Sequence, residues 1–159
     1  MTSAAVITVS DRSSAGERAD TSGAIAVEAL RAAGFDCADP VVVPDGADSV
    51  ERALQAEIIA GVKLIVTTGG TGVAPRDQTP EGTLRVITRE VAGIAEELRR
   101  RGVAEKPAAM LTRGVAGVVD PHGALVVNLP GSPKAVASGM PVVVSVAWHV
   151  LDQLGGGDH

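Results

Sequence analysis

The chain has 159 residues, a length that suits one domain with its own hydrophobic core. Its composition, 45% hydrophobic and 21% charged, is that of an ordinary globular protein, and its net charge of -5 disfavours a nucleic-acid backbone as the main partner. The aromatic residues are Phe35 and Trp148, with no tyrosine, which also disfavours binding of single-stranded nucleic acid by base stacking.

Cysteine, histidine and hydropathy exclude further classes. A single cysteine, Cys37, excludes a disulfide framework and a cysteine-rich zinc site. The histidines, His122, His149 and His159, lie far apart with no metal-ligand spacing. No apolar run approaches the roughly 20 residues that span a bilayer, and the first residues lack the basic region and apolar stretch of a signal peptide. We therefore expect a cytoplasmic protein with no membrane partner.

Short apolar strands alternate with helices along the chain. In chain order, the pattern predicts a strand over 4–9, a helix capped by Asp20 and closed by Gly34, a strand over 41–43, a helix over 50–59, a strand over 63–67, a helix capped by Thr79, a charged helix over 94–101, a helix or turn over 108–113, a weak strand over 115–119, a strand over 124–128, and two helices separated by Pro141 and ending at Leu154.

This alternation predicts an α/β fold, a single-domain three-layer sandwich in which a mostly parallel sheet lies between helices. The domain is expected to cover residues 1–154, and residues 155–159 are expected to form a disordered tail. The final helix carries apolar residues on more than one narrow face. We therefore expect part of it, or of residues 115–119, to lie between subunits.

The connection after the strand at 63–67 is the most informative segment. A strand–helix connection usually needs about two to six residues, and this one uses about a dozen. Gly69, Gly70 and Gly72 let backbone N–H groups turn toward one point, a geometry that suits phosphate. Thr79 is expected to cap the next helix, with Pro80 in its first position. The extra length indicates a function.

Carboxylates follow three of the predicted strands. Ligands of such sheets bind beyond the carboxyl ends of the strands, so we expect Asp11, Asp45 and Asp77 to meet the glycine loop and the PGSPK turn (130–134) at one rim. Phosphate beside carboxylates needs a cation, and Mg²⁺ is the common one, with Asp45 and Asp77 as the best ligands. Alternatively, Asp45 is only a turn residue, and Asp11 pairs with Arg12 or caps the loop.

Two cations lie near predicted helix starts, where the helix dipole disfavours them. Lys134 follows Ser132, the predicted cap, and Pro133, while Arg76 precedes Thr79 by three residues. Bound anions would resolve both conflicts, although long basic side chains can also extend into water. The motifs GxxxxGK[ST], GxGxxG and GxSxG are absent, which leaves direct phosphoryl or nucleotidyl transfer as the more natural chemistry.

The chain resembles the MogA/MoaB family of molybdenum-cofactor biosynthesis, whose eukaryotic counterpart is the G domain of gephyrin. The likeness runs in order from about Ala4 to Leu154, and the combination of TGGTG with RDxTPE at this spacing is specific. The motifs that carry it are ITVSDR (7–12), Asp20 with Ser22-Gly23, Pro44-Asp45, TTGGTG (67–72), PRDQTPE (75–81) and NLPGSPKA (128–135).

The resemblance implies a molybdopterin-binding fold, a homotrimer, and adenylylation of molybdopterin by ATP with Mg²⁺ and release of pyrophosphate, followed by hand-over to a MoeA-type molybdenum insertion protein. It implies that Asp45 and Asp77 are the catalytic, metal-binding carboxylates. With the rim argument, the candidate substrate- and nucleotide-binding residues are Asp11, Gly69, Gly70, Thr71, Gly72, Arg76, Thr112, Pro130, Gly131, Ser132 and Lys134.

Two departures from the family pattern keep alternatives open. Gly46 stands where many members have a second acidic residue, and Asp48 comes only later. The C-terminal region is also shorter than in some MogA proteins. Some MoaB-type paralogues with most of these motifs are not active adenylyltransferases. A non-catalytic pterin-binding or scaffold protein is therefore the main alternative, and an enzyme acting on another phosphorylated small molecule is a third.

Overall fold

A seven-stranded sheet runs through the middle of the protein, which a computed structural model describes over residues 1–157. The strands are β1 (Ser3–Val9), β2 (Asp36–Cys37), β3 (Val41–Val43), β4 (Leu64–Thr68), β5 (Arg89–Glu90), β6 (Ala116–Val119) and β7 (Ala124–Leu129). Their order is β2-β1-β4-β7-β6-β5, and β3 also pairs with β1. The strands from β2 and β3 to β7 are parallel, whereas β6 and β5 are antiparallel to their neighbours.

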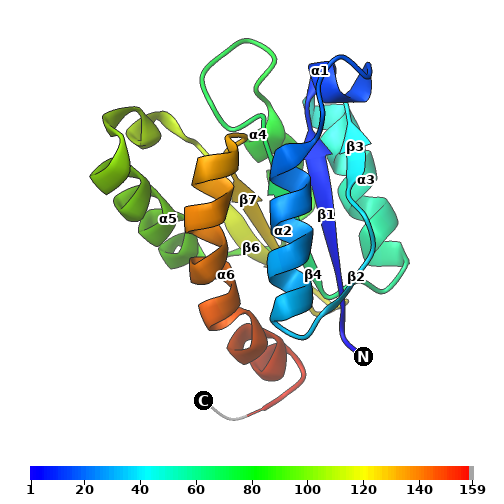
Figure 1. Ribbon diagram of the computed structural model, residues 1–159. Coiled ribbons are helices and arrows are strands. Elements are labelled where there is room, and N and C mark those ends of the chain that lie inside the picture. Colours follow the sequence, from blue (N-terminus) through cyan, green and yellow to red (C-terminus); the bar gives the residue numbers. More distant parts are fainter. Residues whose placement is uncertain (158–159) are drawn as a thin grey trace.

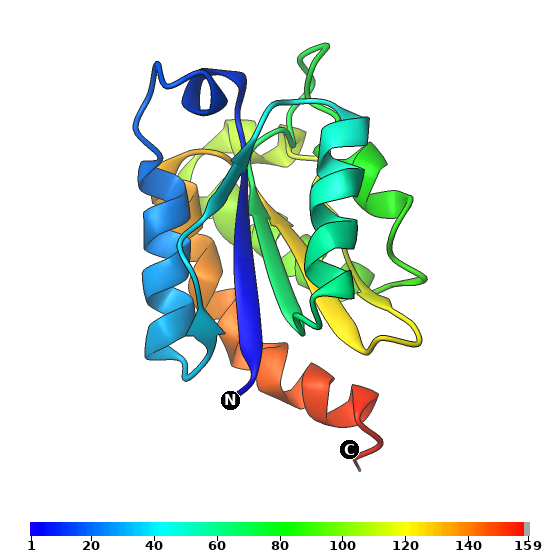
Figure 2. The ribbon, with the colours of Figure 1, turned by 90° about the vertical axis from the view of Figure 1, so that its right-hand side faces the viewer.

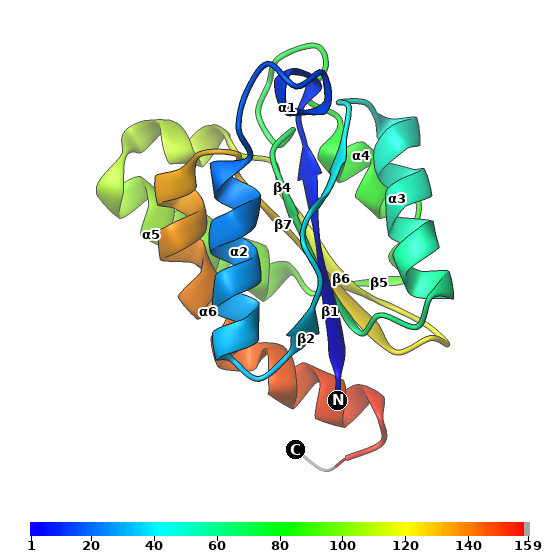
Figure 3. The ribbon, with the colours of Figure 1, turned by 45° about the vertical axis from the view of Figure 1, so that its right-hand side comes forward.

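Helices cover both faces of this sheet. They are α1 (Asp11–Ser14), α2 (Thr21–Ala32), α3 (Ala47–Ile59), α4 (Thr79–Leu84), α5 (Ala92–Glu105), the 3-10 helix η1 (Pro107–Leu111) and α6 (Pro133–Leu154). One face carries α2, α5 and α6, and the other carries α3 and α4 (Figures 1 and 3). The predicted three-layer α/β fold is confirmed.

The central strands feed two hydrophobic cores, because successive side chains of a strand point to opposite faces. Val6, Val66 and Val127 face α2, α5 and α6. Ile7 and Ile65, which follow or precede them in sequence, face α3 with its buried Val50, Leu54 and Ile58. Burial on both faces explains why β1, β4 and β7 are continuous apolar runs, as is typical of parallel strands.

The edge of the sheet beyond β7 differs from the expectation. The weak strand predicted over 115–119 is confirmed as β6, and all of its residues are buried between β7 and β5. Residues 116–119 are thus covered within one chain, which leaves α6 as the other segment for which contacts between subunits are expected. The two-residue strands β2 and β5 escape prediction, since neither is long enough to show a periodic pattern.

The C-terminal helix also differs, since α6 is a single helix of 22 residues with Pro141 inside it. An interior proline costs about 3 kcal/mol. Buried side chains on both sides of it, including Val136 and Ala147, hold the helix against the sheet, and the helix bends part-way along (Figure 2). Its outer face is exposed at Ala137, Pro141 and His149, so within one chain it is not buried on all sides.

Two further expectations concern α6. By length and composition alone this helix would be able to cross a membrane, contrary to the expectation that no segment would, but in the fold it is a core helix. The glycines that follow it cap its end, since Gly155, Gly156 and Gly157 donate backbone hydrogen bonds to its last turn. Residues 158–159 of the expected tail lie outside the described residues.

Candidate functional site

The carboxyl ends of β1, β3, β4 and β7 meet beneath a polar pocket of about 610 Å³. The chain leaves β1 toward α2 on one face and leaves β4 toward α4 on the other, so adjacent strands diverge here, as at the ligand sites of other α/β sheets (Figure 3). The loop after β4 and α1 project beyond this end of the sheet (Figure 1). The expected gathering of carboxylates and glycine turns is confirmed, and the predicted residues that line the pocket are Asp11, Asp45, Asp77, Gly69, Gly70, Gly131 and Ser132.

The glycine loop requires glycine at its first two positions. Gly69 and Gly70 have φ of 90° and 69°, a region that side chains rarely adopt. A Cβ at Gly69 would overlap the carbonyl oxygen of Val9, and one at Gly70 would overlap the Thr79 hydroxyl. The Gly69 N–H donates to the carbonyl of Leu129 at 3.1 Å, which joins the loop to β7.

Thr79 holds the end of this loop rather than capping α4. It is the first helical residue, and the preceding Gln78 makes no side-chain cap. The Thr79 hydroxyl is buried and donates to the carbonyl of Gly69 at 2.9 Å, while its N–H donates to the carbonyl of Gly70 at 3.0 Å. The predicted cap at Thr79 is therefore wrong, because the closely approaching glycine loop takes its hydroxyl.

Asp11 and Asp45 bind each other's backbone. The Asp11 N–H donates to Asp45 Oδ2 at 3.2 Å, and the Asp45 N–H donates to Asp11 Oδ1 at 3.1 Å. Burial raises the pKa of Asp45, and the negative charges of Asp11 and Asp77 raise it further. A cation between these carboxylates would relieve that repulsion, so the donor set fits Mg²⁺.

The carboxylates do not form a complete metal site by themselves. Over residues 1–157, no group of three or more His, Cys, Asp and Glu side chains has the arrangement of a metal site. Mg²⁺ typically takes one or two carboxylates and completes its shell with water and substrate phosphates. Asp45 and Asp77 are therefore the residues that would hold it, with phosphate oxygens as further ligands.

Asp77 is anchored in a local turn. Its Oδ2 accepts from the N–H of Ala74 at 3.1 Å, and its own N–H donates to the Ala74 carbonyl at 2.9 Å. One carboxylate oxygen is thus used within the loop. Oδ1 has no protein donor among the described residues and is available to a cation.

Arg76 crosses from the loop after β4 to the segment after β1. Its Nε and Nη2 donate to the two carboxylate oxygens of Asp11 at 2.6 and 3.0 Å, and Nη2 also reaches the carbonyl of Asp45 at 3.0 Å. This pairing lowers the pKa of Asp11. The alternative pairing of Asp11 with Arg12 is wrong. Because Asp11 already neutralises Arg76, the position of this arginine does not require a bound anion.

The PGSPK turn lies against the glycine loop. Ser132 caps α6 by accepting from the Ala135 N–H at 3.1 Å, and Pro133 is its first residue, as predicted. Ser22 donates to the Gly131 carbonyl at 2.6 Å and fixes the turn on α2. In the described part of the chain, Lys134 has no acidic partner, and the N–H groups of Gly131 and Ser132 meet no protein acceptor. These groups can receive an anion.

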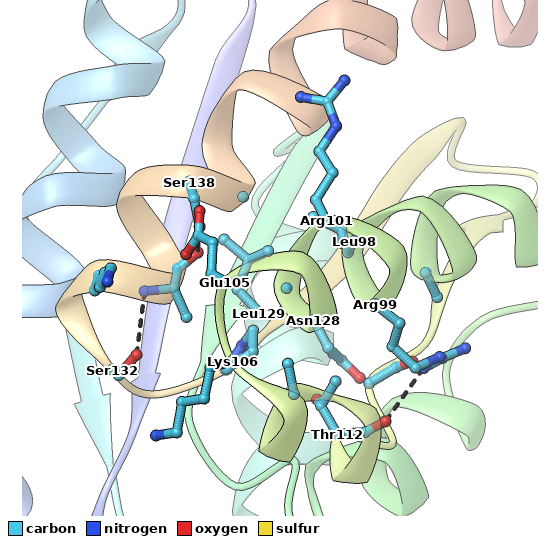
Figure 4. A pocket seen from close by; sticks show the side chains of 18 residues that line it. Leu98, Arg99, Arg101, Glu105, Lys106, Thr112, Asn128, Leu129, Ser132 and Ser138 are labelled. Atoms are coloured by element: carbon cyan, nitrogen blue, oxygen red, sulfur yellow. Dashed lines mark hydrogen bonds between the residues drawn. The ribbon is translucent and has the colours of Figure 1, made fainter.

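A second, mostly apolar pocket of about 250 Å³ lies beside the first, between α5, η1 and the start of α6. Figure 4 shows its walls, which include Leu98 and Leu129. The predicted ligand-binding residues Thr112, Pro130, Ser132 and Lys134 line it, and Ser132 lines both pockets. The predicted residues are thus divided between a polar and an apolar pocket that share one edge.

Of the predicted residues, Thr71, Gly72 and Arg76 line neither of these two pockets, and Thr71 and Gly72 are held by residues behind the loop. Thr112 donates to the Thr71 hydroxyl at 2.9 Å, and the Gly72 carbonyl accepts from Arg113 at 2.8 Å. Both residues therefore shape the loop from behind, and no direct ligand contact follows from their position.

Several residues of the polar pocket were not among the predicted site residues. Arg12 and Arg18 add positive charge, and Asp20 adds a fourth carboxylate. Asp20 accepts from the hydroxyl of Thr8 at 2.6 Å and from the N–H of Gly23 at 2.9 Å, which confirms it as the cap of α2. The sequence could have indicated Asp20 as a site residue, because the helix that it caps follows β1 and therefore begins at the same rim of the sheet.

Comparison with known proteins places the chain among molybdenum-cofactor proteins. Residues 5–149 match the family described as "Probable molybdopterin binding domain". The chain is 38% identical over 156 residues to the molybdenum cofactor biosynthesis bifunctional protein of Synechococcus elongatus, covering 98% of this chain and 48% of that protein, so it spans about half the length of this relative.

Two shorter relatives match over most of their length. The molybdopterin adenylyltransferase of Pyrococcus furiosus is 38% identical over 149 residues, covering 92% of this chain and 87% of that protein. The structure of the molybdopterin biosynthesis Mog protein from Mycobacterium ulcerans is 42% identical and has a TM-score of 0.90, covering 97% of this chain and 99% of that one.

Proposed function

The chain belongs to the molybdopterin-binding domain family of molybdenum-cofactor biosynthesis, and from this premise we propose that it transfers AMP from ATP to molybdopterin. The observation that carries the proposal is the polar pocket, where Asp45 and Asp77 face the glycine loop and the start of α6. It combines carboxylates for a divalent cation with open N–H groups for phosphate, the parts that nucleotidyl transfer needs.

In the proposed reaction, the terminal phosphate of molybdopterin attacks the α-phosphorus of ATP. A new P–O bond forms, the bond to the β-phosphate oxygen breaks, and pyrophosphate leaves. Asp45 and Asp77 would hold Mg²⁺, which when bound neutralises charge on the phosphates. The N–H groups of Gly131 and Ser132 would bind the phosphates, and the ammonium of Lys134, from the adjoining apolar pocket, would balance their charge.

The two pockets divide the labour in this proposal. The polar pocket takes the phosphates, and the adjoining apolar pocket, with Thr112 and Pro130, takes the ring system of the pterin. Ser132, which lines both pockets, and Lys134, which lines the apolar one, would face the phosphate of molybdopterin. Gly69, Gly70, Thr71 and Gly72 give the loop its shape.

A non-catalytic pterin-binding or scaffold protein is the second candidate. The observation that favours it is Gly46 after Asp45, together with the lack of a third carboxylate in metal-binding arrangement within residues 1–157. Such a protein would bind the pterin in the same pockets without turning over ATP.

One experiment separates these candidates. The purified chain is incubated with molybdopterin, ATP and Mg²⁺, and adenylylated molybdopterin and pyrophosphate are measured by mass spectrometry and a coupled assay. Product that depends on all three additions supports the enzyme. Tight pterin binding without product supports the scaffold, and neither binding nor product would refute both.

We also propose a cytoplasmic homotrimer that hands its product to a MoeA-type molybdenum insertion protein. Exposed apolar side chains on α5 and η1, among them Val103, Met110 and Leu111, are available for contacts between subunits. Sedimentation equilibrium at micromolar concentration tests the assembly, and a monomer would refute it.

A further inference from the structure

Arg113, between η1 and β6, binds both ends of the loop that carries Asp77. Its Nε donates to the carbonyl of Gly72 at 2.8 Å, and its Nη2 donates to the carbonyl of Asp77 at 2.7 Å. Its own N–H donates to the carbonyl of Thr71 at 2.7 Å. Arg113, more than thirty positions away in sequence, is thus hydrogen-bonded to the loop both just after its glycines and just before α4 begins.

The guanidinium of Arg113 is itself held from two sides. Nη1 and Nη2 donate to the carboxylate oxygens of Glu81 on α4, at 2.6 and 3.2 Å, and this pairing lowers the pKa of Glu81. Arg99 on α5 donates to the carbonyl of Gly114 at 3.0 Å and fixes the segment that carries Arg113. The orientation of the Arg113 guanidinium is therefore fixed by contacts other than those with the loop.

Contacts of its two neighbours also join Asp77 to the Asp45 segment. Arg76 donates to the carbonyl of Asp45 at 3.0 Å, and Gln78 Oε1 accepts from the Ala47 N–H at 3.2 Å. The turn between Ala74 and Asp77 is local, so it moves with the loop. The ion pair of Arg76 with Asp11 lies at the exposed tip. Among the described residues, the carbonyl of Asp77 itself accepts from one distant side chain, that of Arg113.

We propose that Arg113 is a positioning residue that, together with the contacts of Arg76 and Gln78, sets the distance between Asp77 and Asp45, and so the site at which both carboxylates hold one cation. The inference rests on the proposed function for the role of Asp77. Lysine cannot replace this arginine fully, because a single ammonium cannot serve two carbonyls and a carboxylate in a fixed plane.

The test uses Arg113→Met and Arg113→Lys, with Arg89→Met as the matched control. Arg89 makes a two-point ion pair with Asp120 on the far edge of the sheet and lies in neither pocket. Turnover is measured against ATP and Mg²⁺ concentration, and amide exchange of residues 70–78 is measured without ligands. In Arg113→Met we expect kcat to fall by about a hundredfold. We also expect half-saturation to need more Mg²⁺ and residues 70–78 to exchange faster.

Arg113→Lys should recover part of the rate, and Arg89→Met should match the wild type. A lowered melting temperature of Arg113→Met with unchanged kcat, Mg²⁺ dependence and loop exchange would overturn the proposal. If Arg113→Met does not fold, Arg113→Lys decides by the same measurements. If the wild type transfers no AMP, the proposed function fails, and the loop exchange alone decides whether Arg113 holds the loop.

Discussion

Replacing Asp77 by asparagine removes one negative charge from the polar pocket and keeps the shape of the side chain. In the structure, Asp77 Oδ2 accepts one backbone hydrogen bond, from Ala74. The asparagine oxygen can accept the same bond. A hydrogen bond to a charged acceptor contributes about 1 kcal/mol more than one to a neutral acceptor, so the turn is weakened by roughly that amount.

A second effect opposes this loss. The charge of Asp77 raises the pKa of partly buried Asp45, so the two carboxylates repel each other in the folded protein. Removing one of them relieves this repulsion, and the net change in the free energy of unfolding should stay within about 1 kcal/mol. Turnover should fall much more, by roughly a hundred- to a thousandfold, because electrostatic groups of this kind act on charge in the transition state.

Steady-state turnover with ATP and molybdopterin, together with urea unfolding, measures both quantities. Asp39→Asn is the matched control, since Asp39 is an exposed carboxylate that lines neither pocket. The double variant with Asp45→Asn should lose less than the product of the two single losses, because one cation serves both residues. Normal turnover of Asp77→Asn with a clearly lowered stability would refute the reasoning and leave Asp77 as a turn residue only.

Three other predictions concern the same rim. Burial and the charges of Asp11 and Asp77 raise the pKa of Asp45, so the folded protein loses stability as the pH rises through that pKa and Asp45 ionises. Without Mg²⁺, Asp45→Asn should therefore be at least as stable as the wild type at pH 7 and should lose this advantage below the ordinary aspartate pKa of 3.8, as thermal unfolding against pH will show. Turnover measurements should find the variant inactive. Gly69→Ala combines a positive φ with overlap on the Val9 carbonyl, so the free energy of unfolding in urea should fall by more than about 2 kcal/mol. Gly61→Ala has a similar φ but no atom within 4 Å of the added Cβ, so its free energy of unfolding should fall by about 1 kcal/mol. Equal losses would contradict the role of the close approach at Gly69. Asn128→Leu removes a buried amide that hydrogen-bonds to Thr67, Thr83 and the N–H of Val115, so the free energy of unfolding should fall by about 3 kcal/mol. Thr67→Val removes one of these bonds and should lower it by about 1 kcal/mol. An unchanged stability of Asn128→Leu would show that this network does not hold β7 to β4.

The sequence predicts those parts of the structure that local chemistry determines. The apolar runs of β1, β4 and β7, the cap at Asp20 and the Ser132–Pro133 helix start are all confirmed. The rule that strand ends share one edge is enough to bring the carboxylates together. The roles assigned to them stay predictions until the assays above are made.

The parts that the sequence does not predict depend on contacts between distant segments. Thr79 looks like a cap, but its hydroxyl is taken by Gly69, ten residues earlier. Pro141 looks like a helix end, but packing against the sheet carries the helix through it. Thr112-Arg113 resembles the Ser-Arg of many family members, but nothing nearby in the sequence shows what Arg113 binds, since its partners lie 32 to 41 residues away. Tertiary packing decides each of these cases.

Arg76 and Lys134 differ in whether a carboxylate of the protein neutralises them. Both cations lie near a helix start, so the sequence alone gives them the same weight. Asp11 neutralises Arg76, whereas Lys134 has no acidic partner within residues 1–157 and stands beside the unpaired N–H groups of Gly131 and Ser132. A bound anion is therefore expected at the start of α6. The glycine loop, which is bonded to the Asp11 and Asp45 segments through Arg76 and to the segment before β6 through Arg113, instead positions the carboxylate of Asp77. The proposed cation would then lie between the loop and the anion. The segments before α3 and α4 would contribute the carboxylates, and the start of α6 would contribute the N–H groups and the lysine, to the same site.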